Sequence, residues 1–292
     1  MKRIFYYNIN YFCNNNCLFC FSTSTGQNNR IVSIEQIRQE IELWNMNEND
    51  LIVINGGEPT LHPDFYNIIE YIVDKTESFI SIYTNGTIID ARKIPNTERI
   101  KIIIPIHGNM ETHDLITQNS GSYISTVRAL GEMKDRKYIV CVKFIVGKAL
   151  VNSRFSIVEF LKREKIVPNQ IVIARQNVTP KSIFNEVEEL DIDIYAAFVK
   201  NIFYSLKDEY KLVFLDTPVC LLPVFKNLLP KVIEKPIFFF SDCNNKLVEK
   251  RYYKQIKILS ECACCRSKDV CETIGSSYLT TVYDKEWLIE CE

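Results

Sequence analysis

The sequence is short of histidine and of net charge. Only three of its 292 residues are histidines, so a metal site built from imidazole ligands has almost no donors. The formal net charge is -1, and no strong field therefore favours nucleic acid or anionic lipid as a partner. No apolar run approaches the roughly 20 residues that cross a bilayer, and the first residues lack the apolar core of a signal peptide. These absences predict a cytoplasmic protein that binds neither nucleic acid nor membrane.

Cysteine, in contrast, is abundant. The chain has eleven cysteines, and in a reducing compartment such a number indicates metal or redox chemistry rather than disulfides. Soft thiolates select iron–sulfur clusters or zinc, so any metal site is expected to be a thiolate site. The hydrophobic fraction of 47% and the length allow one large domain, or a large domain followed by a small one.

Three cysteines near the start of the chain have a strict spacing. Cys13, Cys17 and Cys20 form a C-x3-C-x2-C pattern with no nearby fourth cysteine or histidine. A structural zinc site closes its shell with four protein groups, and common iron–sulfur clusters also take four cysteines. Three thiolates on a four-iron cube would leave one iron open to a small molecule. The alternatives are half of a zinc ribbon completed from the C-terminus, or buried apolar cysteines, which the surrounding asparagines argue against.

A second motif follows one expected helix later. Residues 51–54 are apolar and β-branched, which predicts a buried strand. This strand runs into Gly56-Gly57-Glu58-Pro59, where glycine permits positive φ or a close approach of the backbone to a ligand, and proline ends strand pairing. Alone, a Gly-Gly pair indicates only a loop.

Together the two motifs resemble the signature of the radical S-adenosylmethionine (radical SAM) superfamily. The resemblance implies that Cys13, Cys17 and Cys20 hold a [4Fe-4S] cluster whose free iron chelates the amino and carboxylate groups of S-adenosyl-L-methionine (SAM). It also implies that the glycine-rich segment holds the methionine end of SAM through strand-edge backbone and that an aromatic residue lies beside adenine. The residues concerned are Phe19, Gly56, Gly57, Glu58 and Pro59.

Apolar runs alternate with helical periods along the first two thirds of the chain. The expected strands are 3–9, 51–54, 79–83, 101–106, 139–146 and 170–174, and the expected helices are 33–46, 63–75, 121–135, 153–164 and 181–212. This alternation predicts βαβ units and a parallel sheet. Residues 1–205 resemble the partial (βα)6 TIM barrel of the superfamily, and in such barrels the chemistry lies at the carboxyl ends of the strands.

Polar residues follow several of these strands. Thr84 and Asn85 follow the third strand and could reach the SAM carboxylate or ribose, or could simply form a turn, since Asn-Gly is a turn signal. Arg175 ends the sixth strand and could pair with a carboxylate of SAM or substrate, or lie solvated on the surface.

The sequence predicts less specific roles for two histidines and a neighbouring aspartate. His107 follows the fourth strand and either faces the active site or makes an ordinary hydrogen bond. Asp114 is expected to cap or position a helix. His62 is expected to be structural.

Residues 206–292 contain a second cysteine cluster and are expected to form a small cysteine-rich domain. The pattern resembles the SPASM or twitch auxiliary-cluster extensions of radical SAM maturases and implies a second [4Fe-4S] cluster, although the glycine expected two residues after the cysteine run comes four after it. A structural zinc site is the alternative. The implied ligands are Cys220, Cys262, Cys265 and Cys271, with Cys243, Cys264 and Cys291 as competitors.

Spare thiols have one further interpretation. Some radical SAM peptide epimerases return a hydrogen atom to the substrate from a cysteine, and Cys141, Cys243, Cys264 and Cys291 are candidates here. Cys141 lies inside an expected strand, which favours a core position.

The resemblance implies reductive cleavage of SAM to a 5′-deoxyadenosyl radical that abstracts a hydrogen atom, with a flavodoxin- or ferredoxin-type protein as electron donor. The leading hypothesis is a maturase that introduces a thioether, a carbon–carbon crosslink or an epimerised residue into a peptide. The cysteine loop begins at residue 13, so a preceding recognition domain is not expected and a separate protein could recognise the peptide. Alternatives are modification of a nucleoside, sugar or cofactor precursor, and a non-catalytic zinc-binding scaffold.

Overall fold

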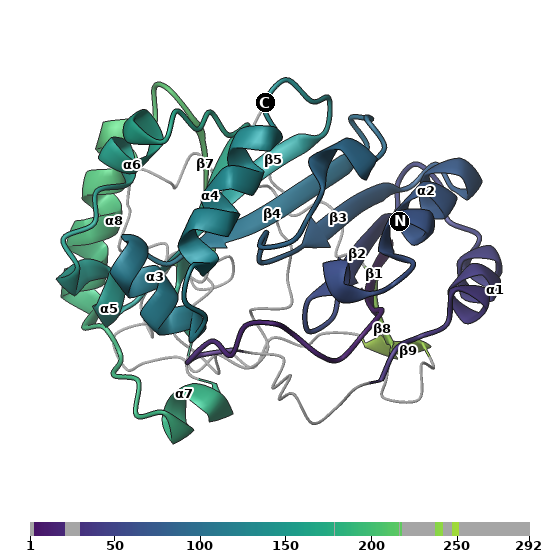
Figure 1. Cartoon of the computed structure of the whole chain (residues 1–292), viewed down its shortest axis with the longest axis horizontal. Coiled ribbons are helices and arrows are strands. Elements are labelled where there is room, and N and C mark those ends of the chain that lie inside the picture. Colours follow the sequence, from purple (N-terminus) through teal and green to yellow (C-terminus); the bar gives the residue numbers. More distant parts are fainter. Residues whose placement is uncertain are drawn as a thin grey trace, which may run out of the picture.

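A parallel β-sheet organises the chain in a computed structural model that describes residues 3–20, 30–177, 179–215, 217, 237–241 and 247–250. The sheet has nine strands in the order β7-β6-β5-β4-β3-β2-β1-β8-β9 (Figure 1). Strands β1 to β7 are neighbours in chain order and run parallel, β8 adds to the free edge of β1 in parallel, and β9 pairs antiparallel with β8.

All six expected strands are present, within a residue or so of the predicted bounds, and three further strands, β7, β8 and β9, were not expected. Their β-branched sequences suit strands that are covered on both faces. The strands are β1 Arg3–Asn8, β2 Leu51–Asn55, β3 Phe79–Tyr83, β4 Ile100–Ile106, β5 Ile139–Val146, β6 Gln170–Arg175, β7 Lys211–Leu215, β8 Ile237–Ser241 and β9 Leu247–Lys250.

The helices pack mainly against one face of this sheet, as Figure 1 shows. They are α1 Ile34–Trp44, α2 Phe65–Lys75, α3 Met110–Thr117, α4 Ser122–Glu132, α5 Lys148–Asn152, α6 Ile157–Arg163, α7 Pro180–Phe184 and α8 Ile192–Leu206, with short 3₁₀ turns at Pro59–Leu61 and Ala91–Lys93. No helix among the described residues combines the length and apolar character needed to cross a membrane.

Alternating strand residues divide the core between the two faces. Phe144 belongs to the large core under the helices, whereas its neighbours along β5 point to the opposite face. There Cys141 packs with Ile103, Val172 and Val213 in a smaller cluster made of strand residues. The period of two along each strand produces this division.

The single helix expected over 181–212 is wrong. Asp191 begins a new helix because its carboxylate accepts hydrogen bonds from the backbone N–H groups of Asp193 and Ile194 at 2.8 and 3.3 Å. Farther on, Leu212 and Phe214 belong to β7, where a β-branched and aromatic run favours a strand. The helix expected over 153–164 corresponds to α6, which begins four residues later than expected, at Ile157, and a separate short helix, α5, lies before the expected range.

The expected domain boundary between residues 205 and 206 stays a prediction. Strands β7 and β8 come from the second range, yet they extend the sheet of the first range. Most of the remaining second range lies outside the described residues.

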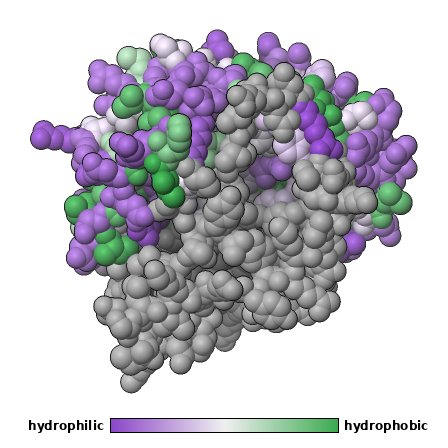
Figure 2. All heavy atoms as spheres, turned by 90° about the horizontal axis from the view of Figure 1, so that it is seen from below, coloured by the Kyte–Doolittle hydropathy of each residue, from purple (hydrophilic) through white to green (hydrophobic). Residues whose placement is uncertain are grey.

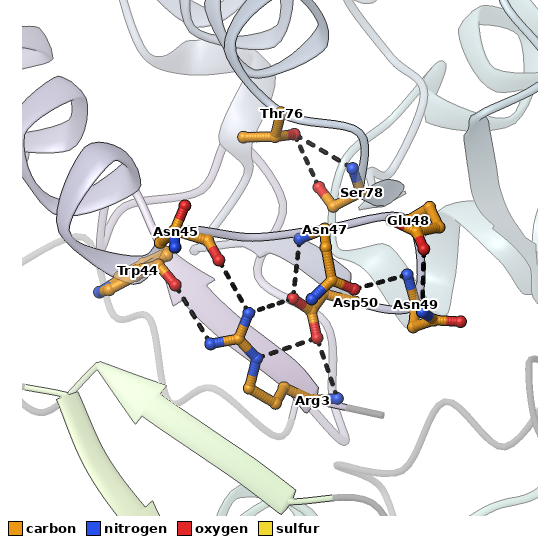
Figure 3. A network of polar contacts seen from close by, with 9 residues as sticks. All are labelled: Arg3, Trp44, Asn45, Asn47, Glu48, Asn49, Asp50, Thr76 and Ser78. Atoms are coloured by element: carbon orange, nitrogen blue, oxygen red, sulfur yellow. Dashed lines mark hydrogen bonds and ion pairs between the residues drawn. The ribbon is translucent and has the colours of Figure 1, made fainter. Parts of the chain in front are cut away.

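An ion pair lies at the amino-terminal ends of the strands (Figure 3). The Arg3 guanidinium donates to the Asp50 carboxylate, from Nε at 3.0 Å and from a terminal nitrogen, and also to the carbonyls of Trp44 and Asn45 at 3.2 and 2.9 Å. Asp50 is fully buried and also accepts from the backbone N–H of Asn47 at 2.9 Å. The network joins β1 to the turn between α1 and β2, at the end of the sheet that serves stability in barrels of this kind.

Seen from below, the described surface is largely hydrophilic, with small hydrophobic patches (Figure 2). The large exposed apolar side chains include Leu43 on α1, Val167 after α6 and Phe184 on α7. Ile183 is also exposed, beside Phe184, and the others are scattered singly, which is ordinary for a protein surface.

Candidate active site

The cysteine loop leaves the carboxyl end of β1 and runs across the ends of the neighbouring strands toward α3 and α7 (Figure 1). Cys13, Cys17 and Cys20 are half-buried and free of disulfides. The backbone N–H of Cys20 donates to the Cys17 carbonyl at 3.2 Å, which closes the second half of the loop. The three thiols are near enough for Cys13 and Cys20 both to raise the pKa of Cys17.

The surroundings of these thiols favour the binding of a positively charged metal centre. Burial raises the pKa of Cys13 to about 11 and that of Cys17 to about 12, and neighbouring thiols add to the shift. Lys181 partly opposes the shift at Cys17. A thiolate ligand set of this kind is therefore stable only when a metal compensates its charge.

A four-iron cluster fits this donor set. The described residues bring no three His, Cys, Asp or Glu side chains around one point, which is the arrangement of a single ion. In a four-iron cube each thiolate would bind a different iron, so that requirement does not apply. Three half-buried thiols on one loop, none of them in a disulfide, suit such a cube.

Consecutive asparagines brace the loop between Cys13 and Cys17. Asn14 donates to the Thr87 hydroxyl at 2.8 Å, after β3. Asn15 accepts from the side chain of Asn119 at 2.7 Å, in the turn between α3 and α4, and Asn119 also donates to the Asn14 carbonyl at 3.3 Å. The loop is thus tied to two turns at the carboxyl end of the sheet.

The end of helix α3 supports the second half of the same loop. The backbone N–H groups of Asn16 and Leu18 donate to the carbonyls of Thr117 and Ile116, both at 2.9 Å. These carbonyls belong to the last turn of α3, where no intrahelical donor remains.

Helix α7 holds the loop from the opposite side. The Lys181 ammonium donates to the Asn16 side chain at 2.7 Å, and Asn185 donates to the Leu18 carbonyl at 2.8 Å. A capping box at Thr179 and Ser182 starts this short helix. Sequence reasoning missed Asn119, Lys181 and Asn185, since no local pattern connects them to the cysteines; the run of three asparagines was the only visible signal.

Gly56 and Gly57 are needed for close approach rather than for positive φ. The backbone N–H of Gly57 donates to the Asn10 carbonyl at 3.2 Å, and that of Glu58 donates to the Phe12 carbonyl at 2.8 Å. A Cβ on Gly57 would lie 2.1 Å from the Phe12 carbonyl oxygen, and one on Gly56 would lie 2.1 Å from the Asn10 side chain. Any larger residue would push the cysteine loop away from β2.

The Glu58 carboxylate is buried and fully engaged within the protein. It accepts from the backbone and hydroxyl of Thr60 at 3.1 and 2.6 Å, from the Thr84 hydroxyl at 2.6 Å and from the backbone N–H of Asn85 at 2.6 Å. Burial raises the pKa of Glu58, and these hydrogen bonds oppose the shift. Its side chain therefore ties β2 to β3 rather than meeting a ligand. Pro59 begins the 3₁₀ turn that follows.

Thr84, Asn85 and Gly86 form the expected turn, with Gly86 at a φ of 75°. The side chain of Asn85 lies against the cysteine loop, its nitrogen 3.8 Å from Cys13 Sγ. A contact of Thr84 or Asn85 with SAM stays a prediction.

His107 lies at the carboxyl end of β4, behind the cysteine loop. Its ring meets that of Phe19 edge-on with centroids 5.4 Å apart, and its backbone N–H donates to His113 Nδ1 at 3.3 Å. Burial, followed by the charges of His113 and Lys143, lowers the pKa of His107 well below its usual value. His107 is thus a neutral group, and Phe19 beside adenine stays a prediction.

The remaining predicted residues lie apart from the loop. Arg175 ends β6, as expected, and forms an ion pair with Glu189 at 3.7 Å. Cys141 is fully buried in β5 and donates to the Gln170 side chain at 3.3 Å, which confirms the core position; a role as hydrogen donor stays a prediction.

His62 and Asp114 are structural, as expected. The ring nitrogens of His62 bond to the Val32 carbonyl at 2.7 Å and to the backbone N–H of Asp64 at 3.0 Å. Asp114, on α3, caps the following helix α4 rather than its own, by accepting from residues at the start of α4.

The second cysteine cluster lies outside the described residues. The cysteines concerned are Cys220, Cys243, Cys262, Cys264, Cys265, Cys271 and Cys291.

Comparison with known proteins agrees with this geometry. Residues 7–153 match the family model described as the radical SAM superfamily. The chain is 29% identical over 139 residues to the antilisterial bacteriocin subtilosin biosynthesis protein AlbA of Bacillus subtilis, covering 46% of this chain and 31% of AlbA. It is 25% identical over 169 residues to the Fe-coproporphyrin III synthase of Methanosarcina barkeri, covering 56% of this chain and 42% of that protein. The matches thus span less than half of these relatives.

Solved structures share the fold. Streptococcus suis SuiB bound to S-adenosylmethionine superposes with a TM-score of 0.64 at 15% identity, covering 93% of this chain and 72% of SuiB. SuiB bound to precursor peptide SuiA superposes with a TM-score of 0.58 at 13% identity, covering 82% of this chain and 57% of SuiB. The parallel α/β sheet with outer helices is therefore the expected partial TIM barrel.

Proposed function

The chain belongs to the radical SAM superfamily, and on that premise we propose that it is a maturase that modifies a peptide. The observation that carries the proposal is the cysteine loop, whose three thiols, none of them in a disulfide, lie at the carboxyl ends of the strands with no fourth cysteine or histidine nearby in the sequence. When bound, the [4Fe-4S] cluster supplies the electron that cleaves SAM to methionine and a 5′-deoxyadenosyl radical for hydrogen abstraction.

The residues of the chain prepare the site for this chemistry. Cys13, Cys17 and Cys20 would hold the cluster, and the loop that carries them is fixed from three sides. The backbone at Gly56 and Gly57 passes close to this loop and would hold the methionine end of SAM. Bracing of this kind keeps the reacting groups in place and limits the access of water.

A peptide substrate is favoured by two resemblances. The relative AlbA is named for biosynthesis of a bacteriocin, and the fold neighbour SuiB binds a precursor peptide. The modification would be a thioether, a carbon–carbon crosslink or an epimerised residue. We further propose an electron donor of the flavodoxin or ferredoxin type, a separate peptide-recognition protein, and a second [4Fe-4S] cluster on Cys220, Cys262, Cys265 and Cys271.

A small-molecule substrate is the second candidate. The similarity to an Fe-coproporphyrin III synthase extends over 169 residues, more than the similarity to AlbA. Both candidates share the same cofactor chemistry, so only the substrate separates them.

Anoxic reconstitution tests the proposal. The protein, loaded with iron and sulfide, is incubated with SAM, dithionite and a precursor peptide encoded beside its gene. We expect 5′-deoxyadenosine and a peptide changed in mass or stereochemistry. A peptide that stays unchanged while 5′-deoxyadenosine forms would count against a maturase, and coproporphyrin compounds then become the substrates to assay.

Matched cysteine variants test the site itself. Cys17→Ala should lose the iron of the loop and all SAM cleavage, because it removes a ligand. Cys141→Ala removes a buried thiol on β5 and should keep the iron content of the unmodified protein. Equal iron in both variants would contradict the ligand assignment.

A further inference from the structure

We propose that Asn85 raises the reduction potential of the catalytic cluster by donating an N–H···S hydrogen bond to Cys13. This makes Asn85 a positioning and tuning residue. The inference rests on the proposed function, since it requires a cluster on Cys13, Cys17 and Cys20.

The amide of Asn85 divides its two protons between neighbouring residues of the cysteine loop. Nδ2 lies 3.8 Å from Cys13 Sγ and 2.8 Å from Asn14 Oδ1. The backbone N–H of Asn15 also donates to Cys13 Sγ, at 3.3 Å. Cys13 thus receives one donor from its own loop and one from the turn after β3.

The orientation of the amide is determined by its other end. Oδ1 of Asn85 accepts from the backbone N–H of Thr87 at 2.9 Å and from its hydroxyl at 2.7 Å. Both lone pairs of the oxygen are then used, so the flipped amide would set an oxygen against Asn14 Oδ1 and an NH₂ group against the backbone N–H of Thr87. The nitrogen must therefore face the sulfur.

The backbone of Asn85 is held as firmly as its side chain. Its N–H donates to the buried Glu58 carboxylate at 2.6 Å, and its carbonyl accepts from the Thr126 hydroxyl at 2.9 Å. The amide is therefore positioned before any cluster binds, which is the property of an outer-sphere partner of a metal ligand.

The direction of the effect follows from charge. Reduction adds one electron to the cluster and increases the negative charge on its sulfur ligands. A donor to sulfur stabilises the reduced form more than the oxidised form, so it raises the reduction potential. Without it, the cluster becomes harder to reduce.

Asn85→Ala tests the proposal through the midpoint potential, measured by redox titration monitored by electron paramagnetic resonance, in the absence of SAM. We expect the midpoint of Asn85→Ala to be more negative than that of the unmodified protein. Asn119→Ala is the matched control: it removes two asparagine bonds to the same loop but none to sulfur, and its midpoint should not move. An unchanged midpoint in Asn85→Ala, or equal shifts in both variants, would overturn the proposal.

A second pair of variants serves if Asn85→Ala does not assemble a cluster. Thr87→Ser keeps the hydroxyl that orients the Asn85 amide, whereas Thr87→Val removes it. The midpoint should be more negative in Thr87→Val than in Thr87→Ser, and identical midpoints would overturn the proposal. Failure of the unmodified protein to bind iron or cleave SAM would instead overturn the proposed function, so the two failures are distinct.

Discussion

The Glu58 carboxylate accepts a hydrogen bond from the backbone N–H of Asn85 at 2.6 Å and thereby joins the end of β2 to the end of β3. Asn85 in turn contacts Cys13, and the backbone N–H of Glu58 donates to the Phe12 carbonyl, so Glu58 ties the start of the cysteine loop to the sheet through its carboxylate and its backbone. The glycine-rich segment therefore does two things: its backbone lies beside the loop, and its acid holds the next strand.

Glu58→Gln should lower both stability and SAM cleavage. The amide nitrogen would face a backbone or hydroxyl donor in a buried site, which leaves a donor unsatisfied and costs roughly 1–3 kcal/mol. Chemical denaturation measures the free energy of unfolding. The control is Glu42→Gln, which alters an exposed carboxylate that accepts only from the Tyr71 hydroxyl, and which should change stability by less than about 0.5 kcal/mol. Equal effects of the two substitutions would contradict the bracing role.

Two glycine-to-alanine substitutions should have opposite effects. Gly57→Ala places a methyl group 2.1 Å from the Phe12 carbonyl oxygen, so the cysteine loop must move, and iron binding should fall sharply. Gly131→Ala adds a methyl group on helix α4 where, apart from the backbone of the helix itself and the adjacent residues, no described atom lies within 4 Å, and it should stabilise the protein by roughly 0.5–1 kcal/mol. Iron content and thermal unfolding of both variants provide the measurement. Full iron binding by Gly57→Ala would show that the close approach is not needed.

The strands and the motifs were predictable from sequence because their signals are local. Runs such as Ile100–Ile106 are rich in isoleucine, and Cys13 and Gly57 follow strands closely in the sequence, so topology alone brings them to one end of the sheet. The carboxyl ends of parallel strands meet whatever the intervening helices contain.

The supports of the loop could not be predicted, because they depend on tertiary placement. Lys181 reaches Asn16 across 165 positions, and Asn185 reaches Leu18 across 167, without any periodic pattern between them. Asp114 was expected to cap a helix, but only the structure shows that it serves α4. Side-chain-to-backbone bonds over such separations carry no local signature.

Asp114 should stabilise the protein in a pH-dependent way. Its carboxylate accepts from the backbone N–H groups of Gly121 and Tyr123 at 2.6 and 2.8 Å and from the Ser122 hydroxyl at 2.9 Å. Burial acts to raise the pKa of Asp114, but these hydrogen bonds outweigh it and hold the pKa below its usual value. A carboxyl with a depressed pKa contributes stability above its unfolded pKa of about 3.9, and this is lost as pH falls through the folded pKa.

Asp114→Ala should therefore cost about 1–2 kcal/mol at pH 7, the range of a lost helix cap, and progressively less below about pH 4. Denaturant unfolding at a series of pH values gives the difference from the unmodified protein. The control Glu132→Ala removes an exposed, distant partner of Arg128 on α4 and should change stability by at most about 0.5 kcal/mol. A penalty for Asp114→Ala that is independent of pH would exclude the ionised cap.

Asp50→Asn should affect stability without affecting the site, because Asp50 lies at the opposite end of the strands. The buried carboxylate accepts from the guanidinium and backbone N–H of Arg3 and from the backbone of Asn47. Since the Arg3 side chain is 28% exposed, its unpaired charge remains partly hydrated, and the loss should be about 2–3 kcal/mol rather than more. Asp208→Asn, in an exposed pair with Lys207, should cost less than about 0.5 kcal/mol. Iron content and SAM cleavage per folded molecule should equal those of the unmodified protein in both variants. A loss of iron or of SAM cleavage in fully folded Asp50→Asn alone would mean that the two ends of the sheet are coupled.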